Sequence, residues 1–116
     1  MGLEGNSIDI RGTIIFILSL IYLFSEEVRL AALKNREALK IRPEDILIQA
    51  HRGHIYLFQG NWKMAQHAYL ENAQSTKEET NQKVALTLLE ELQAFKKAKI
   101  KHPLLAKAIR LLQKEN

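Results

Sequence analysis

A tetrapeptide occurs twice in this chain, and the spacing of its two copies constrains the fold more than any other feature. The sequence IYLF occupies residues 21–24 and again residues 55–58, a shift of 34 positions. The same shift superimposes two pairs of small residues, Ser19 on Gly53 and Ala31 on Ala65. A period of about 20–50 residues is typical of repeat architectures, in which stacked units bury a continuous core. The chain is therefore expected to contain at least two copies of one structural unit.

Each unit is predicted to be a pair of helices. Strong helix formers are plentiful, whereas the chain has only 5 Gly and 2 Pro. The apolar residues between 85 and 95 follow the i, i+3, i+4, i+7 spacing of one helix face. Pro43, Gly60 and Pro103 interrupt the helical pattern. Helices are expected over six segments that would pair as three antiparallel hairpins: residues 8–24, 26–41, 44–59, 62–73, 80–100 and 104–114.

The pattern resembles the tetratricopeptide repeat, whose unit is two antiparallel helices spanning 34 residues. Residues 46–79 carry the family's small and aromatic positions at Gly53, Tyr56, Gly60, Trp62, Ala65 and Tyr69. Residues 12–45 carry them at Ser19, Tyr22, Ala31, Ala38 and Pro43. The resemblance implies an all-α fold, a tetratricopeptide-like α-solenoid of about three hairpins. It would form a single domain over residues 8–116, preceded by a disordered tail at residues 1–7.

The match to the family is incomplete. Asn35 occupies a position where a large aromatic residue is usual, and Arg52 occupies a usual leucine position. A third unit would cover residues 80–113, where Glu90 falls on the tyrosine position. These last two helices are expected to form a divergent or capping hairpin, which shields the end of a solenoid. An unrelated helical bundle with a coincidental repeat is the alternative.

The resemblance also implies a binding surface, because the first helix of each unit lines a concave groove in this family. By position, the groove would be apolar and lined by Phe16, Leu20, Leu23, Phe24, Leu47, Ala50, His54, Leu57 and Phe58. A scaffold, adaptor or small chaperone that binds a protein or peptide partner is therefore expected. In the alternative interpretation, these side chains belong to the core and are covered by the C-terminal helices or by a second copy of the chain.

The almost wholly apolar segment 13–24 raises the question of a membrane. A spanning helix needs ~20 apolar residues, and Arg11 and Glu26 bound this run at about half that length. A secretory signal is opposed by the acidic residues Glu4 and Asp9 that precede the run. A buried helix in a cytoplasmic protein is expected, with a membrane-attached or secreted protein as the alternative.

The same segment predicts self-association. Apolar residues cover every side of the helix, so some of them would remain outward in a monomer. Exposed apolar area of this kind is typical of an interface, and a two-fold contact needs only one self-complementary patch. The sequence therefore predicts a homodimer that buries the first helix.

Positive charge is concentrated at the C-terminal end. The whole chain has a formal net charge of +4, but residues 94–116 hold seven Lys or Arg against one Glu. The basic residues are Lys96, Lys97, Lys99, Lys101, Lys107, Arg110 and Lys114. A solvated helix face is expected, and the alternative is a surface for an anionic partner: an acidic protein, a membrane or nucleic acid. No aromatic platform accompanies the lysines, which disfavours nucleic acid.

Candidate catalytic and metal-binding residues are few. His51 and His54 are spaced i, i+3, which allows one ion to be shared, but neither they nor His67 have a carboxylate or Cys at a supporting spacing. The histidines are expected to be partly exposed, with no metal or other cofactor. The adjacent glutamates at 78–79 and 90–91 point about 100° apart on a helix, so neither pair forms an acid/base dyad. Without a nucleophile motif, a phosphate-binding glycine loop or a cysteine, no enzymatic activity is expected.

Overall fold

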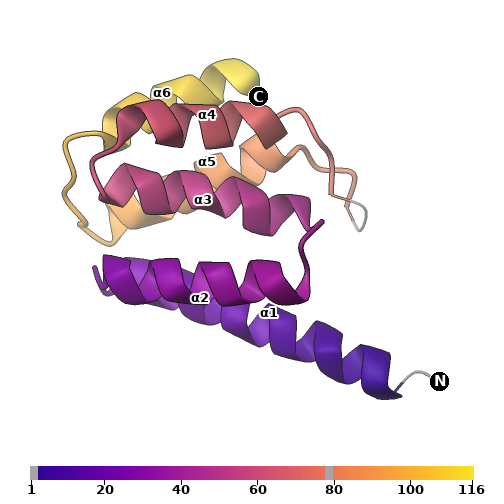
Figure 1. Ribbon diagram of the computed structural model, residues 1–116. Helices are drawn as coiled ribbons and strands as arrows, with labels where there is room; N and C mark the ends of the chain where they lie inside the picture. The colour runs from indigo at the N-terminus through magenta and orange to yellow at the C-terminus, as the bar shows by residue number, and fades with distance from the viewer. Residues whose placement is uncertain (1–2, 78–79) are drawn as a thin grey trace.

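The protein is all-α, as a computed structural model that describes residues 3–77 and 80–116 shows (Figure 1). Residues 1–2 and 78–79, and with them the Glu78–Glu79 pair, lie outside the described part. The helices are α1 (Leu3–Phe24), α2 (Val28–Ile41), α3 (Ile46–Phe58), α4 (Trp62–Asn72), α5 (Val84–Lys97) and α6 (Leu105–Glu115). They pack as three hairpins, α1 with α2, α3 with α4 and α5 with α6, which confirms the predicted class and pairing.

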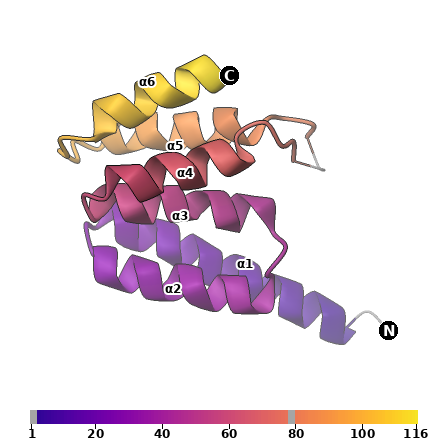
Figure 2. The same ribbon diagram turned by 45° about the horizontal axis from the view of Figure 1, so that its top comes forward.

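The three hairpins lie in successive layers, with α3 and α4 in the middle (Figure 2). The largest side chains that are fully buried are Tyr69 of α4 and Phe95 of α5. The small residues of the repeat lie inside the packed helices: Ser19, Ala31 and Ala65 are all fully buried. The core is continuous from Leu23 in α1 to Leu112 in α6. The middle hairpin therefore connects the two outer ones into one packed unit.

All three hairpins turn in the same way. Two positions after the last residue of the first helix of each hairpin, the chain passes through the left-handed region, at Glu26 (φ 61°), Gly60 (φ 80°) and Lys99 (φ 65°). In each turn the amide of the next residue donates to a carbonyl five positions back, with N···O distances of 2.8, 2.9 and 3.1 Å. This is the Schellman arrangement, which satisfies carbonyls that the helix end would otherwise leave unpaired. Only one of the three turns has a glycine, so sequence alone does not reveal the common geometry.

Several helix boundaries differ from the predicted ones. The left-handed Glu26 delays α2 to Val28, and the left-handed Lys99 ends α5 at Lys97 rather than at residue 100. Before α5, an isolated antiparallel bridge between Thr76 and Lys83 holds the chain extended, so the helix begins at Val84 instead of residue 80.

The N-terminal boundary also differs, because α1 begins at Leu3, inside the segment that was predicted to be a disordered tail. Once nucleated, a helix gains one hydrogen bond for each further residue that it orders, so extension by a turn is inexpensive. The first turns of α1 extend beyond the end of α2, away from the other helices (Figure 1).

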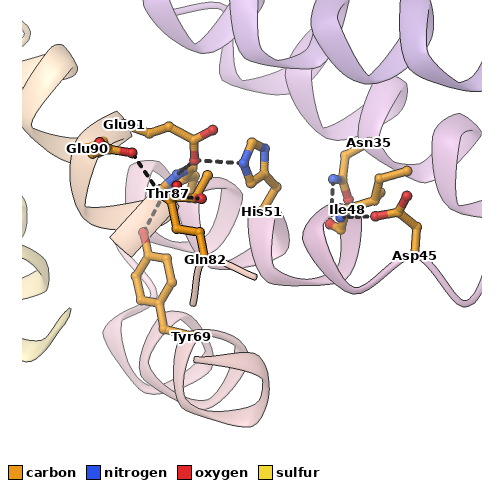
Figure 3. Close-up of polar contacts among 10 residues, drawn as sticks. Asn35, Asp45, Ile48, His51, Tyr69, Gln82, Thr87, Glu90 and Glu91 are labelled. Carbon is orange, nitrogen blue, oxygen red and sulfur yellow. Dashed lines mark hydrogen bonds and ion pairs between the residues drawn. The ribbon is translucent and has the colours of Figure 1, made fainter. Parts of the chain in front are cut away.

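Asn35, the most conspicuous departure from the repeat pattern, has a defined structural role. Its side chain is buried on α2 and its Nδ2 donates to the carbonyl of Ile48 on α3, at 3.2 Å. Figure 3 shows this contact beside Asp45, which caps α3 by accepting from the amide of Ile48. A buried polar side chain must be hydrogen-bonded to avoid a desolvation penalty. Asn35 therefore joins the first hairpin to the second where an aromatic residue would only fill space.

Candidate functional site

An exposed apolar stripe runs along the outer face of α1. Its members are 37–58% exposed and follow one another at intervals of four and three residues: Ile10, Ile14, Ile17, Ile21 and Phe24. At 100° per residue, this spacing keeps all five within about 80° of the helix circumference. The opposite face of α1 packs inward through Ser19 and Leu23. The apolar segment thus has one buried face and one that is largely exposed, although Phe24 at the end of the stripe also contacts Phe95 on α5.

The predicted groove is mostly closed. Four of its nine residues are fully buried: Leu23, Ala50, His54 and Leu57. Another four are partly buried, namely Phe16, Leu20, Leu47 and Phe58, while Phe24 is 37% exposed. The four buried residues are core, as the alternative interpretation had it, and contact with a partner would require the helices to separate.

The side chain of Phe95 on α5 closes the groove. Its ring lies between those of Phe24 and Phe58, with centroids at 4.6 and 5.2 Å, and it meets His54 at 5.4 Å. Phe95 is itself fully buried. The last hairpin therefore packs against the first helices of both preceding hairpins, and its apolar face fills the space that a peptide would occupy. Periodicity identified Phe95 as an inward-facing residue but not the surface against which it packs.

A pocket of about 400 Å³ lies near the start of α3, at the opposite end of that helix from Phe58. The middle of α1, the α2–α3 connection with the start of α3, and the extended segment before α5 form it, through Thr13, Phe16, Arg42, Asp45, Leu47 and Lys77. Arg42 crosses its mouth, donating to the Thr13 hydroxyl at 3.1 Å and pairing with Asp45 at the same distance. Of the predicted groove, Phe16 and Leu47 are the members that line this pocket.

A polar cluster of His51, His54 and Glu91 lies within the apolar interior. Both imidazoles are fully buried on α3, one turn apart, and Glu91 reaches them from α5. Figure 3 shows Glu91 beside His51. Glu91 Oε1 lies 2.7 Å from His51 Nε2 and 3.0 Å from His54 Nε2. The Phe16 ring covers His51 at a centroid distance of 4.5 Å. The Glu91 side chain is 17% exposed and connects the cluster to solvent.

Tyr69 extends this cluster from α4. Its hydroxyl lies 2.7 Å from Nδ1 of His54, whose Nε2 faces Glu91. Glu91 is ionised, so the network assigns the proton of a neutral His54 to Nε2, which donates to the carboxylate, while Nδ1 accepts from the tyrosine hydroxyl. A Tyr–His–Glu chain of hydrogen bonds thus crosses from α4 through α3 to α5.

Burial and charge set the protonation of the cluster. Desolvation by burial lowers the pKa of His54 below its ordinary 6.5, although the hydrogen bond with Glu91 opposes this. Burial raises the pKa of Glu91, but the adjacent imidazoles of His51 and His54 outweigh it and hold the pKa at about 2. Burial, with the nearby Glu91 charge, raises the pKa of Tyr69 well above its ordinary value. The cluster therefore holds an anionic carboxylate at neutral pH.

The histidine prediction needs correction. His51 and His54 were expected to be partly exposed but are fully buried, and only His67 on α4 is exposed, with 73% of its side chain accessible. A carboxylate does join the pair, but Glu91 is 37 residues from His54 along the chain and comes from another hairpin. Spacing within one helix could not reveal it. Together, His51, His54 and Glu91 could hold a metal ion, since their ligand atoms all lie within 4.8 Å of one another.

The predicted basic residues are all exposed at the end of the molecule formed by α5, α6 and their connection. Lys107, Arg110 and Lys114 lie along one side of α6, whereas Lys99 and Lys101 lie in the connection. Lys107 Nζ stands 4.9 Å from the centre of the Trp62 ring, a cation–π contact. Among the side chains of residues 10–77 and 80–116, none of the seven pairs with a carboxylate.

Comparison with family models, curated proteins and solved structures found no match to this chain. Over the part of the chain that the structure describes, no helix has both the length and the apolar character needed to cross a membrane.

Proposed function

We propose that this chain is a non-catalytic helical-repeat module of tetratricopeptide type, and that it self-associates through the stripe on α1. The observation that carries the proposal is the run of five exposed apolar side chains at alternating four- and three-residue intervals. This is the spacing of the seam of a coiled coil, in which two helices bury such stripes against each other. A contiguous exposed apolar patch is typical of a protein interface.

The repeat itself supports the tetratricopeptide interpretation. Pairs of residues 34 positions apart have matching environments: Ser19 and Gly53 are both buried, and so are Ala31 and Ala65. The turn residues Glu26 and Gly60 share the same shift and the same left-handed backbone. A duplicated unit would produce two hairpins with buried small residues at equivalent positions and with the same turn. A coincidental repeat would match in sequence but not in burial and turn geometry.

The occupant that best fits the stripe is the stripe of a second copy. In an antiparallel pair centred on Ile17, the side chains of Ile14 and Ile21 would face each other, as would those of Ile10 and Phe24. Each of these pairs matches one apolar side chain of the stripe with another, so the seam is self-complementary about a two-fold axis and favours a two-fold antiparallel contact.

Cysteine cross-linking tests this arrangement cleanly, because the chain has no cysteine of its own. Under mild oxidation, Ile17→Cys should form a disulfide-linked dimer, since position 17 would face itself across the two-fold axis. Ile10→Cys alone should not cross-link, whereas an equimolar mixture of Ile10→Cys and Phe24→Cys should. Leu70→Cys is the matched control, because Leu70 is 40% exposed on α4, away from the stripe.

The pattern of cross-links separates the possible outcomes. A disulfide in Ile10→Cys alone would indicate parallel helices and contradict the antiparallel contact. Equal cross-linking of Leu70→Cys and Ile17→Cys would show random collision. Absence of cross-linking at every stripe position would contradict self-association and leave the stripe to a helix of another protein or to a lipid surface.

A second candidate function uses the basic end, because its seven exposed cations are unpaired within the described residues. In this case the chain would bind an anionic partner. Fluorescence anisotropy at 50 and 200 mM salt measures this binding, with a labelled duplex DNA as the polyanion probe. Binding through several phosphate contacts should weaken by orders of magnitude over about this salt range and should weaken further in Lys107→Gln/Arg110→Gln. Affinity that is unchanged by salt would exclude this function.

A further inference from the structure

We infer that His51, His54 and Glu91 form a binding site for a divalent transition-metal ion of the Zn²⁺ type. Two imidazoles and one carboxylate are a ligand set that zinc accepts in open sites, where a water completes the tetrahedron. The ligand atoms come from two elements and already converge, with His51 Nε2 and His54 Nε2 at 2.7 and 3.0 Å from Glu91 Oε1. This inference does not depend on the proposed self-association.

The strongest indication of a missing ligand is the state of His51. Its imidazole is fully buried, and in the described structure neither ring nitrogen has a hydrogen bond of acceptable geometry. Nε2 approaches Glu91 closely but is poorly aligned with it. A buried nitrogen without a partner carries a desolvation penalty. An ion between His51 and Glu91 would accept the lone pair of Nε2 and remove the penalty at that nitrogen.

The Glu91 oxygen already lies near the spacing from the two nitrogens that a tetrahedral ion requires. Zinc lies at about 2.0–2.2 Å from nitrogen and oxygen ligands, so neighbouring ligands of a tetrahedral ion are about 3.3 Å apart. The Glu91 oxygen would therefore move away from the two nitrogens by only a few tenths of an ångström. Because the Glu91 side chain is partly exposed, it has room to move, and it offers an access route from solvent.

Tyr69 supplies the outer support that a histidine ligand needs. When Nε2 of His54 binds the ion, its proton must reside on Nδ1, which lies 2.7 Å from the tyrosine hydroxyl. A hydroxyl can accept as well as donate, so the contact persists with its direction reversed. Such outer hydrogen bonds fix the ring orientation of metal-bound histidine. Tyr69 is thus a positioning residue for the site and not a ligand.

An ion at this site would join α3 of the middle hairpin to α5 of the last one. Direct packing between these two hairpins is sparser than packing within each hairpin. A ligand that binds only the folded state stabilises it in proportion to its concentration. The metal would therefore act as a structural clamp on the hairpin that closes the predicted groove.

Titration of chelator-treated full-length protein with ZnCl₂ tests the site. One equivalent should bind, as measured by calorimetry, and the melting temperature should rise by roughly 5–15 °C at saturation. Co²⁺ should give the visible absorption bands of a tetrahedral nitrogen–oxygen site. Glu91→Gln should lose the zinc-dependent rise, whereas His67→Gln should retain it, because His67 is an exposed histidine beside Glu71.

A measurement on the unmutated protein tests the site even if Glu91→Gln fails to fold. Long-range ¹H–¹⁵N spectra should show zinc shifting the Nε2 resonances of His51 and His54 while those of His67 and His102 stay in place. The inference is overturned if one equivalent of zinc causes no thermal shift, if the shift survives Glu91→Gln, or if the resonances of His67 are the ones that move.

Discussion

Gly53 on α3 lies directly against the ring of Tyr69 on α4. A Cβ at position 53 would stand 2.4 Å from two carbons of that ring, a distance that real Cβ atoms do not reach. Tyr69 cannot retreat, because it is fully buried and its hydroxyl is held by His54. The close approach of α3 and α4 is therefore possible only with glycine at this position.

Gly53→Ala should destabilise the protein by about 1–3 kcal/mol, because the added methyl overpacks the helix crossing. Chemical denaturation followed by circular dichroism measures the change in the free energy of unfolding. Ser19→Ala, at the equivalent place in the first hairpin, is the control, since it adds no volume. A neutral effect of Gly53→Ala would mean that the helices are further apart than described.

The shared turn geometry predicts opposite effects of glycine and alanine. Glu26→Gly and Lys99→Gly should each stabilise the protein by roughly 0.5–1 kcal/mol, because a residue with a Cβ is strained in the left-handed region. Gly60→Ala should destabilise it by about 1 kcal/mol for the same reason. No atom crowds a Cβ at position 60, so the loss would come from backbone strain alone. Thermal melts of the three variants would contradict the common turn if all three changes had the same sign.

The two repeats predict equal roles for Ala31 and Ala65. Both side chains are fully buried, so Ala31→Leu and Ala65→Leu should each cost about 1–3 kcal/mol through overpacking. Ala106→Leu is the matched control, because Ala106 is exposed on α6 and should tolerate the change. If only one of the two buried variants were destabilised, the equivalence of the hairpins would be lost.

Phe95 tests how the groove is closed. Phe95→Ala should cost about 3–5 kcal/mol, because it leaves a cavity between Phe24, Phe58 and His54. The thermal midpoint reports the loss, and Phe95→Leu should recover most of it. A loss below 1 kcal/mol would show that the last hairpin does not pack here and that the groove is open.

The sequence predicts the helices and their pairing because both depend on local signals: apolar periodicity, prolines and the 34-residue repeat. It does not predict the turns at Glu26 and Lys99, since a strained non-glycine residue leaves no signature. Nor does it predict that Glu91 joins His51 and His54, because that contact depends on how α5 packs across α3. The same holds for the predicted groove. Its residues were assigned from matching positions of the family's repeat, but whether they are exposed depends on how Phe95 packs against them.

Self-association through the stripe on α1 determines the molar mass of the protein in solution. Size-exclusion chromatography with light scattering, at micromolar concentration and without detergent, should give twice the monomer mass for the unmutated protein. Ile17→Glu should give the monomer mass with unchanged helicity, because a charge in the seam is costly to bury. Leu70→Glu, the matched exposed position on α4, should leave the dimer intact. A monomer mass for the unmutated protein, or a dimer that persists in Ile17→Glu, would contradict self-association through the stripe.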